Sequence, residues 1–349
     1  MKLPLRPAAL LFAGLLLLAA CQPSASGSPS DSGAAAPSGD DLTGDIQVSG
    51  SSTVYLITAP LFEAFTAMHP GVAGFVDNPG TSDGFEVFCN DETDIQDASR
   101  AIQEDEAAVC AENSVEYLEL KVGIDGMAVI TSAMNTDIAC LSILDLYALL
   151  GAESQGFANW SDANDLAADL VAQFGTDFGE SHAPYPDEQL TVTAPGEESG
   201  TYGSFVELAI QGIADDRDQE RETRPDYQAS GDDNVIIEGV AGTEDAPFTL
   251  GWVGFAYAVE NSDRVSFIEV DRGDGCTEAN PDTISAAEYP LSRYLYIYPN
   301  LAHAADEPAV AAFVDYYLSD EGIAFVSEEG YVQLHEDDLA ASREAWENR

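Results

Sequence analysis

Three short clusters of glycine, serine and threonine carry the residue types that can bind an anion without a cofactor. They lie at residues 49–54 (SGSSTV), 80–85 (GTSDGF) and 198–202 (ESGTY). Each follows a short apolar run and precedes a helical pattern. The first amides of a helix are unpaired and carry a partial positive charge, so they bind oxyanions. Serine, threonine and glycine are also common helix caps and turn residues, so one cluster alone equally indicates only a helix start.

Catalytic residues are harder to find in this sequence. The four histidines are scattered, and none lies near the three clusters: His69, His182, His303 and His335. Residues 196–200 (GEESG) miss the G-x-S-x-G nucleophile motif by one position. The acidic groups at 91–94 and 232–233 lack EF-hand order, so a solvated acidic face is the simpler interpretation. We predict no catalytic residue, cofactor or metal; an exported phosphatase and a secreted adhesion module are the alternative classes.

The segments around the clusters alternate strand and helix patterns, which predicts an α/β fold. Strands are expected at 45–49, 72–76, 93–99, 116–124, 127–131, 189–194, 250–253 and 265–270. Helices are expected at 54–69, 104–113, 141–150, from 201 onward and at 308–326. Each cluster therefore sits where a strand gives way to a helix.

The N-terminus has the pattern of an export signal. Lys2 and Arg6 precede an apolar run at residues 8–20, which ends in the sequence LAAC at Cys21. This is the bacterial lipobox, which predicts lipidation of Cys21; an ordinary signal peptide with an incidental cysteine is the alternative. Residues 22–43 are rich in Ser, Gly, Ala, Pro and Asp, which predicts a flexible tether. We expect an exported lipoprotein, anchored on the periplasmic or cell-surface side of a bacterial membrane.

The four cysteines that remain after Cys21 are expected to form two disulfides, since an exported protein folds in an oxidising compartment. Three pairings are possible. Proximity in the sequence favours Cys89 with Cys110, which leaves Cys140 with Cys276. A zinc site is disfavoured because no CxxC pair exists.

The charge of the chain is extreme. There are 63 acidic and 12 basic residues, which gives a formal net charge of −51. Such a surface repels nucleic acid and anionic lipid, so we exclude both as partners. It indicates a salty, halophilic setting, because the Debye length is only about 3 Å at 1 M salt. Simple acidity of an extracytoplasmic surface is the alternative explanation.

The three clusters recur together with other short motifs in a particular order. In chain order these are 50–55 (GSSTVY), 80–81 with 84–85 and 88–89, 92–95 (ETDI), 98–100 (ASR), 159–162 (NWSD), 199–201 (SGT) and 250–254 (LGWVG). Their order and spacing resemble the phosphate-binding proteins of bacterial ABC importers. The resemblance covers nearly all of the chain after the tether.

This resemblance implies a two-lobed periplasmic-binding-protein fold of type II, with the ligand in the cleft between the lobes. We expect a first lobe at 44–130, a second lobe at 131–258 and a return to the first lobe at 259–349. The cysteine pattern of the family also favours the pairing of Cys89 with Cys110. The implied function is capture of inorganic phosphate and its delivery to the subunits of an ABC permease, by a monomer. Another tetrahedral oxyanion is the alternative ligand.

Carried over residue by residue, the resemblance assigns the anion contacts to small residues of the three clusters: Ser52, Thr53, Val54, Thr81, Ser199, Gly200 and Thr201. Family members carry an arginine shortly before the third cluster, where this chain has Pro195, and an aspartate where it has Arg100. We expect Arg100 to bind two oxygens of the anion, because its planar guanidinium matches them; pairing with Glu197 or Glu198 is the alternative. Asp83 is the candidate acceptor of the phosphate proton, which would discriminate against sulfate.

Overall fold

The computed structural model describes residues 42–197, 199–243 and 246–349. The predicted export signal with Cys21, and the tether up to residue 41, lie outside the described residues. The last tether position, Thr43, already begins strand β1 (Thr43–Gly50). Among the described residues, no helix is long and apolar enough to cross a membrane.

The first part of the fold is a small parallel sheet covered by helices. Strand β1 lies between β2 (Gly71–Val76) and β3 (Ile95–Ala98) and is parallel to both. Helix α1 (Ser52–Met68) connects β1 to β2, and helix α2 (Thr81–Cys89) connects β2 to β3. Helix α3 (Glu104–Glu112) follows and is joined to α2 by the disulfide Cys89–Cys110.

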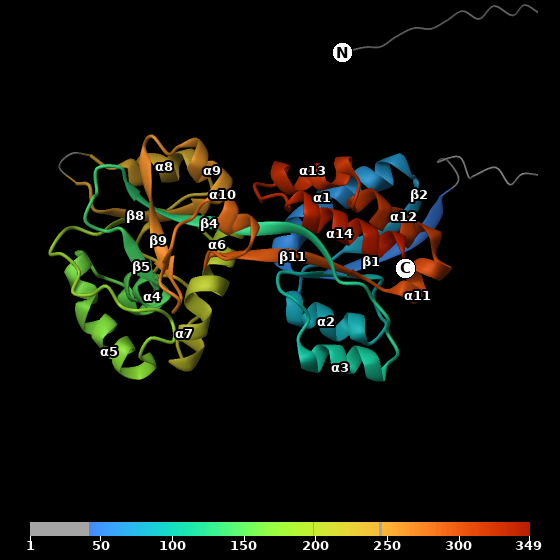
Figure 1. The fold of residues 1–349 in the computed structure, drawn as a ribbon, viewed down its shortest axis with the longest axis horizontal. Coiled ribbons are helices and arrows are strands. Elements are labelled where there is room, and N and C mark those ends of the chain that lie inside the picture. The colour runs from blue at the N-terminus through green and yellow to red at the C-terminus, as the bar shows by residue number, and fades with distance from the viewer. Residues whose placement is uncertain (1–41, 198, 244–245) are drawn as a thin grey trace, which may run out of the picture. The chain divides into compact units, whose positions relative to one another are not determined.

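Two long strands run from this part of the protein to the next. The first half of β4 (Leu120–Ser132) pairs with β11 (Ser292–Pro299), which also pairs with β3. The second half of β4 pairs with β8 (Thr249–Gly254) and β9 (Val265–Asp271). Figure 1 shows β4 and β11 running between the two groups of elements. The sequence predicts two separate strands here, but β4 is continuous and almost wholly buried.

The second group of elements is larger. Its remaining strands are β5 (Cys140–Ser142), β6 (Thr191–Ala194), β7 (Gln228–Ala229) and β10 (Cys276–Thr277). Its helices are α4 (Ile143–Leu150), α5 (Asn164–Phe174), α6 (Gly200–Phe205), α7 (Gln211–Asp216), α8 (Asp233–Ala241), α9 (Phe255–Glu260) and α10 (Pro281–Ser285). A π-helical turn (Val206–Ile210) joins α6 to α7, so the helical backbone is continuous. The disulfide Cys140–Cys276 joins β5 to β10, so both predicted cysteine pairings are present.

The chain ends in four helices that return to the first group. They are α11 (Leu301–Asp306), α12 (Pro308–Tyr317), α13 (Asp320–Glu328) and α14 (Glu336–Glu347). The single helix predicted at 308–326 is therefore wrong. The Ser319 side chain accepts a hydrogen bond from the Gly322 amide (3.0 Å), which caps a new helix start after α12.

Buried apolar side chains form separate cores in the two groups. One core packs α1 and α12 against β1, with Ile46, Val48, Phe65 and Phe313 fully or almost fully buried. The other packs α4 and α8 against the far half of β4 and also contains residues of β9 and α10. The predicted two-lobed α/β architecture is confirmed. Residues 265–291, expected in the first lobe, thus contribute to the core of the second.

Candidate functional site

The first cluster forms the tight turn from β1 into α1. Gly50 has φ +140°, and a Cβ there would overlap the Asp97 carbonyl oxygen, so only glycine fits. The Ser51 hydroxyl caps α1 by accepting hydrogen bonds from the amides of Thr53 (3.2 Å) and Val54 (3.3 Å). These two amides, predicted to bind the anion, therefore already have an acceptor. The Ser52 side chain lies exposed at the first position of the helix.

The second cluster leaves the start of α2 without a side-chain cap. The N-cap is Gly80, with φ +113° and no side chain to accept the first-turn amides. The Thr81 hydroxyl contacts the Ser99 hydroxyl (3.1 Å), and the Ser82 hydroxyl accepts a hydrogen bond from Arg100 Nη2 (3.0 Å). Asp83 lies exposed in the first turn. Uncapped amides and hydroxyls therefore gather at one helix end.

The third cluster begins α6, and Glu198 lies outside the described residues. The Ser199 hydroxyl accepts a hydrogen bond from the Thr201 amide (3.2 Å). Gly200 lies against α1, because a Cβ at Gly200 would be only 2.5 Å from Leu56 Cδ1. The start of α6, which carries the third cluster, therefore lies beside α1, the helix that follows the first cluster.

Arg100 pairs with Glu106, a residue that the sequence did not suggest as its partner. Its guanidinium makes two hydrogen bonds to the carboxylate of Glu106 on α3, at 2.7 and 2.8 Å. This bond raises the pKa of Arg100 and keeps the side chain charged. Arg100 remains about 30% exposed. The two guanidinium nitrogens that were predicted to bind the anion therefore bond to Glu106. This geometry does not support Arg100 as the bidentate partner of the anion.

A second arginine, Arg293 on β11, lies where the clusters meet. Its Nη2 donates to the Thr53 hydroxyl (3.2 Å) of the first cluster and to the Ser204 hydroxyl (3.3 Å) of α6. Its Nε donates to the Asp125 carboxylate (3.1 Å), and its Nη1 pairs with Glu207. The side chain is only 14% exposed. Burial lowers the pKa of Arg293, but the two carboxylates raise it more, so the guanidinium stays charged.

The second and third clusters line two separate cavities, and no residue of the first cluster lines either of them. A cavity of about 680 Å³ is lined by the second cluster, by Ser99, by residues of the π-turn and α7, and by β11. A cavity of about 320 Å³ is lined by the third cluster with Leu56 and Tyr331. Asp125 lines the smaller cavity and its ion-pair partner Arg293 lines the larger. Both cavities lie between elements of the two cores.

The larger cavity contains several of the few basic side chains of this protein. Three arginines line it, Arg100, Arg221 and Arg293, in a chain with only 12 basic residues. Two carboxylates, Asp83 and Glu207, line it as well. Together with the uncapped start of α2, the arginines make this cavity the candidate anion site in a chain with a net charge of −51. Among the described residues, no histidine lines either cavity.

Sequence reasoning missed Arg293 and Asp125. They lie on strands rather than beside a small-residue cluster, and Arg293 is 240 residues from Thr53 in the sequence. One signal was available. A lone arginine in the otherwise apolar strand SRYLYIYP is unusual in a chain with so few cations.

Comparisons with known proteins define the class of this chain. A model of the PBP superfamily domain matches residues 28–321. The chain therefore belongs to the PBP superfamily, the class of two-lobed binding proteins that the fold and the cleft indicate.

The chain is also similar to individual named proteins. The chain is similar to "Protein SphX" of Synechocystis sp., with 34% identity over 293 residues, which cover 84% of this chain and 79% of that protein. It is similar to "Phosphate-binding protein PstS" of Staphylococcus haemolyticus, with 28% identity over 84% of this chain and 82% of the relative. Among solved structures, a "possible phosphate binding protein" from Planctomyces limnophilus is 32% identical, with a TM-score of 0.76 over 88% of this chain and 99% of the other.

Proposed function

We propose that this chain is the extracytoplasmic binding component of a phosphate importer, which captures inorganic phosphate and delivers it to an ABC permease. The observation that carries the proposal is the position of Arg293. It bonds the first cluster through Thr53, bonds α6 through Ser204, and lines the arginine-rich cavity beside the second cluster. The names of the relatives SphX and PstS support the same ligand class.

The proposed binding mode uses backbone and hydroxyl donors together with arginine. The phosphate lies at the start of α2, where the amides of residues 81–83 and the Thr81 hydroxyl donate to its oxygens. Arg293 and Arg100 supply positive charge, and both are already oriented by carboxylate partners. Thr53, from α1, and residues 199–201 of α6 complete the site from the other sides when the lobes close and expel water. No bond of the ligand is broken.

We also propose a lipid anchor, a tether and new lobe boundaries. Cys21 carries the lipid, and residues 22–42 are the tether. The second lobe begins near residue 131. We place its end near residue 291 rather than 258, since β9 and α10 belong to its core. β4 and β11 are then the strands about which the lobes close.

Two assays separate the proposed binding protein from an exported phosphatase. A binding protein is stabilised by its ligand, so phosphate should raise the melting temperature of the full chain in a concentration-dependent way. A phosphatase would release phosphate from a chromogenic ester. We expect the shift and no hydrolysis; ester hydrolysis, or no shift with phosphate, would contradict the proposal.

The role of Arg293 has its own test. Arg293→Gln should weaken phosphate binding about tenfold to hundredfold, because a charge-assisted hydrogen bond contributes about 1.5–3 kcal/mol. Arg343→Gln is the matched control, since Arg343 also pairs with a carboxylate, Asp320, but lines neither cavity. The free energy of unfolding of both variants should be measured alongside. Equal phosphate affinity in the two variants would remove Arg293 from the site.

A further inference from the structure

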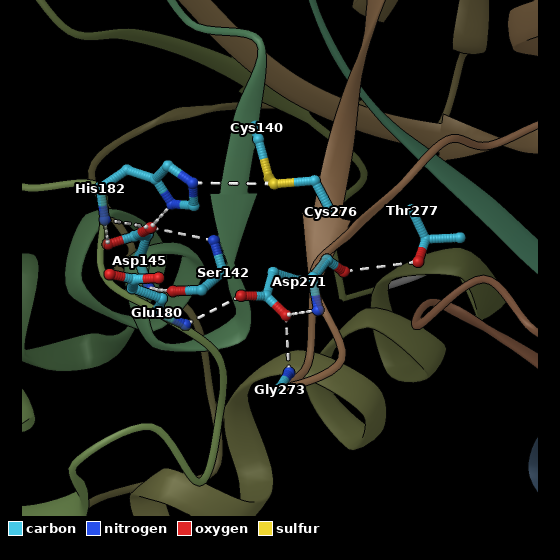
Figure 2. Close-up of a disulfide and its surroundings, with 10 residues drawn as sticks. Cys140, Ser142, Asp145, Glu180, His182, Asp271, Gly273, Cys276 and Thr277 are labelled. Atoms are coloured by element: carbon cyan, nitrogen blue, oxygen red, sulfur yellow. Dashed lines mark hydrogen bonds and ion pairs between the residues drawn. A yellow bond between two sulfur atoms is a disulfide. The ribbon is translucent and has the colours of Figure 1, made fainter.

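Three potential metal ligands, the two sulfurs of the disulfide Cys140–Cys276 and the ring of His182, lie close together, and none of them lines the cavities described above. The Nε2 atom of His182 lies 3.8 Å from Cys276 Sγ. The two sulfur atoms and a ring nitrogen of His182 all lie within 4.8 Å of one another. Figure 2 shows the imidazole ring directed at the disulfide. Among the described residues, no other group of three cysteine, histidine or acidic side chains is this close.

The histidine is held in place by a buried carboxylate. His182 Nδ1 lies 2.8 Å from Asp145 Oδ2, and the Asp145 side chain is fully buried (0% exposed). Asp145 also accepts hydrogen bonds from the Ser142 amide (2.9 Å), the Ser181 hydroxyl (2.9 Å) and the Tyr185 hydroxyl (2.5 Å). In the neutral imidazole whose Nδ1–H donates to this carboxylate, the lone pair of Nε2 lies on the side of the sulfurs. A carboxylate bonded to the second nitrogen is the usual partner of a metal-binding histidine.

We propose that Cys140, Cys276 and His182 form a redox-gated site for a thiophilic divalent cation of the zinc class, which binds when the disulfide is reduced. A dithiol or a phosphine supplies the two electrons. With a phosphine and one water, the S–S bond breaks, two thiols form and the phosphine becomes its oxide. The cation then displaces one proton from each thiol. Two thiolates, the imidazole and one water make a four-coordinate site.

The surroundings of the cluster favour a cation over other uses of these side chains. Cys276 is exposed and His182 is 35% exposed, so an ion has access and a water has room. The nearby carboxylates of Asp145, Asp271 and Glu180 act on His182 electrostatically and attract positive charge. The same carboxylates disfavour anionic thiols that would exchange with the disulfide. Cys89 and Cys110, by contrast, are at most 1% exposed, and their disulfide has no histidine in such a cluster.

The test uses Co²⁺ as a spectroscopic probe, because tetrahedral thiolate coordination gives strong visible absorption. The full chain is reduced with a phosphine, freed of it without oxygen, and titrated with Co²⁺. We expect one Co²⁺ per reduced chain and no such absorption in the oxidised protein. His182→Gln should weaken binding at least tenfold, and Asp145→Asn by tenfold to hundredfold. His303→Gln is the matched control, since His303 also bonds an aspartate, Asp94, but does not belong to this group of three ligands.

Several outcomes would overturn the proposal. One is the absence of thiolate absorption, including the case in which the reduced chain unfolds and takes up no Co²⁺. Another is equal uptake by His182→Gln and the unsubstituted chain. A third is uptake that persists when Cys140 and Cys276 are both replaced by serine, because the ion would then be bound by other cysteines of the chain. None of these results would bear on the proposed phosphate binding, because that proposal concerns the oxidised chain.

Discussion

Several polar side chains of the larger cavity already have hydrogen-bond partners in the protein, and this affects which of them can select the ligand. Arg100 and Arg293 have carboxylate partners, and the Thr81 hydroxyl contacts Ser99. Asp83 lies exposed at the start of α2 and lines the same cavity. At neutral pH, phosphate carries a proton that sulfate lacks. The Asp83 carboxylate would accept a hydrogen bond from the protonated oxygen of phosphate. It would repel sulfate, which has no such proton.

Asp83→Asn should therefore reduce the preference for phosphate over sulfate about tenfold or more, since a hydrogen bond to a charged group contributes about 1.5–3 kcal/mol. Competition binding with both anions measures the ratio. Asp105→Asn is the control, because Asp105 lies in the first turn of α3 and lines neither cavity. An unchanged ratio in Asp83→Asn would assign proton recognition to another residue.

A second carboxylate, Asp97 on β3, is fully buried behind the first cluster. Neither of its oxygens has a hydrogen-bond partner of normal geometry, and it lies near Thr58 and Tyr317. Burial raises the pKa of Asp97 from 3.8 to about 8, against a smaller lowering by the Thr58 hydroxyl. The folded protein therefore keeps a proton here that the unfolded chain loses.

This pKa fixes the sign of a pH dependence. Between pH 3.8 and about 8, the Asp97 contribution to the free energy of unfolding should decrease as pH rises, because the folded state binds more protons. The slope is at most about 1.4 kcal/mol per pH unit. Asp97→Asn, which mimics the protonated form, should flatten the dependence in denaturant unfolding at about pH 5 and about pH 7. A variant whose slope equals that of the unsubstituted protein would show that Asp97 is ionised when folded.

Site residues that stand in a recognisable short motif could be predicted from the sequence. Site residues whose contacts are far away in the sequence could not. Thr53, Thr81 and Ser199 stand in clusters whose sequence alone indicates a helix start, and the structure places each of them in the first turn or at the cap. Arg293 has no such signal, because its partners Thr53 and Asp125 are 240 and 168 residues away in the sequence. The orientation of Arg100 could not be predicted either, because the residue types do not show that its guanidinium pairs with Glu106.

At the level of elements, the site depends on where three helices begin. α1 and α6 have serine caps, and α2 has a glycine N-cap. Gly84 lets α2 lie directly on β1: a Cβ there would be 2.5 Å from the Gly50 Cα and would overlap the Gln96 side chain. Gly203 on α6, by contrast, has open space where its Cβ would be.

Gly84→Ala should displace the start of α2, destabilise the protein by about 1–3 kcal/mol and weaken phosphate binding. Gly203→Ala should stabilise it by up to about 1 kcal/mol, because alanine has the higher helix propensity. Denaturant unfolding and phosphate titration of both variants check this. Similar effects of the two substitutions would contradict the close packing of α2 on β1.

Only some of the elements were predictable, and β11, which carries Arg293, was not among them. Apolar periodicity and turn residues placed α1, α3, β2, β8 and β9 within two residues of their observed ends. The break after α12 was missed because apolar residues continue across Ser319 into α13. Helix α14 was missed because only Ser342 and Trp346 are buried on it, so its sequence lacks an apolar stripe.

The net charge of the whole molecule has the same sign as the phosphate ligand that we propose. The net charge of −51 repels an anion at long range, and the three arginines act only within the cavity. Salt screens the distant charges most, since the Debye length falls from about 30 Å at 0.01 M to about 3 Å at 1 M. Contacts inside a partly buried site are screened much less.

The rate of phosphate association should therefore rise several-fold from low to high sodium chloride, while the dissociation rate changes little. Stopped-flow binding at constant pH measures both rates. Most anion sites in less acidic proteins would show the opposite trend. A fall in association rate with salt would mean that local positive charge, rather than the net charge, controls approach to the cleft.

The most direct test of the account is calorimetric titration of the full chain with phosphate, arsenate and sulfate at low and high salt. We expect one saturable phosphate site per chain, competition by arsenate, rejection of sulfate, and weaker binding in Arg293→Gln. Absence of saturable phosphate binding at both salt concentrations would contradict it. Stronger binding of sulfate than of phosphate would contradict it as well.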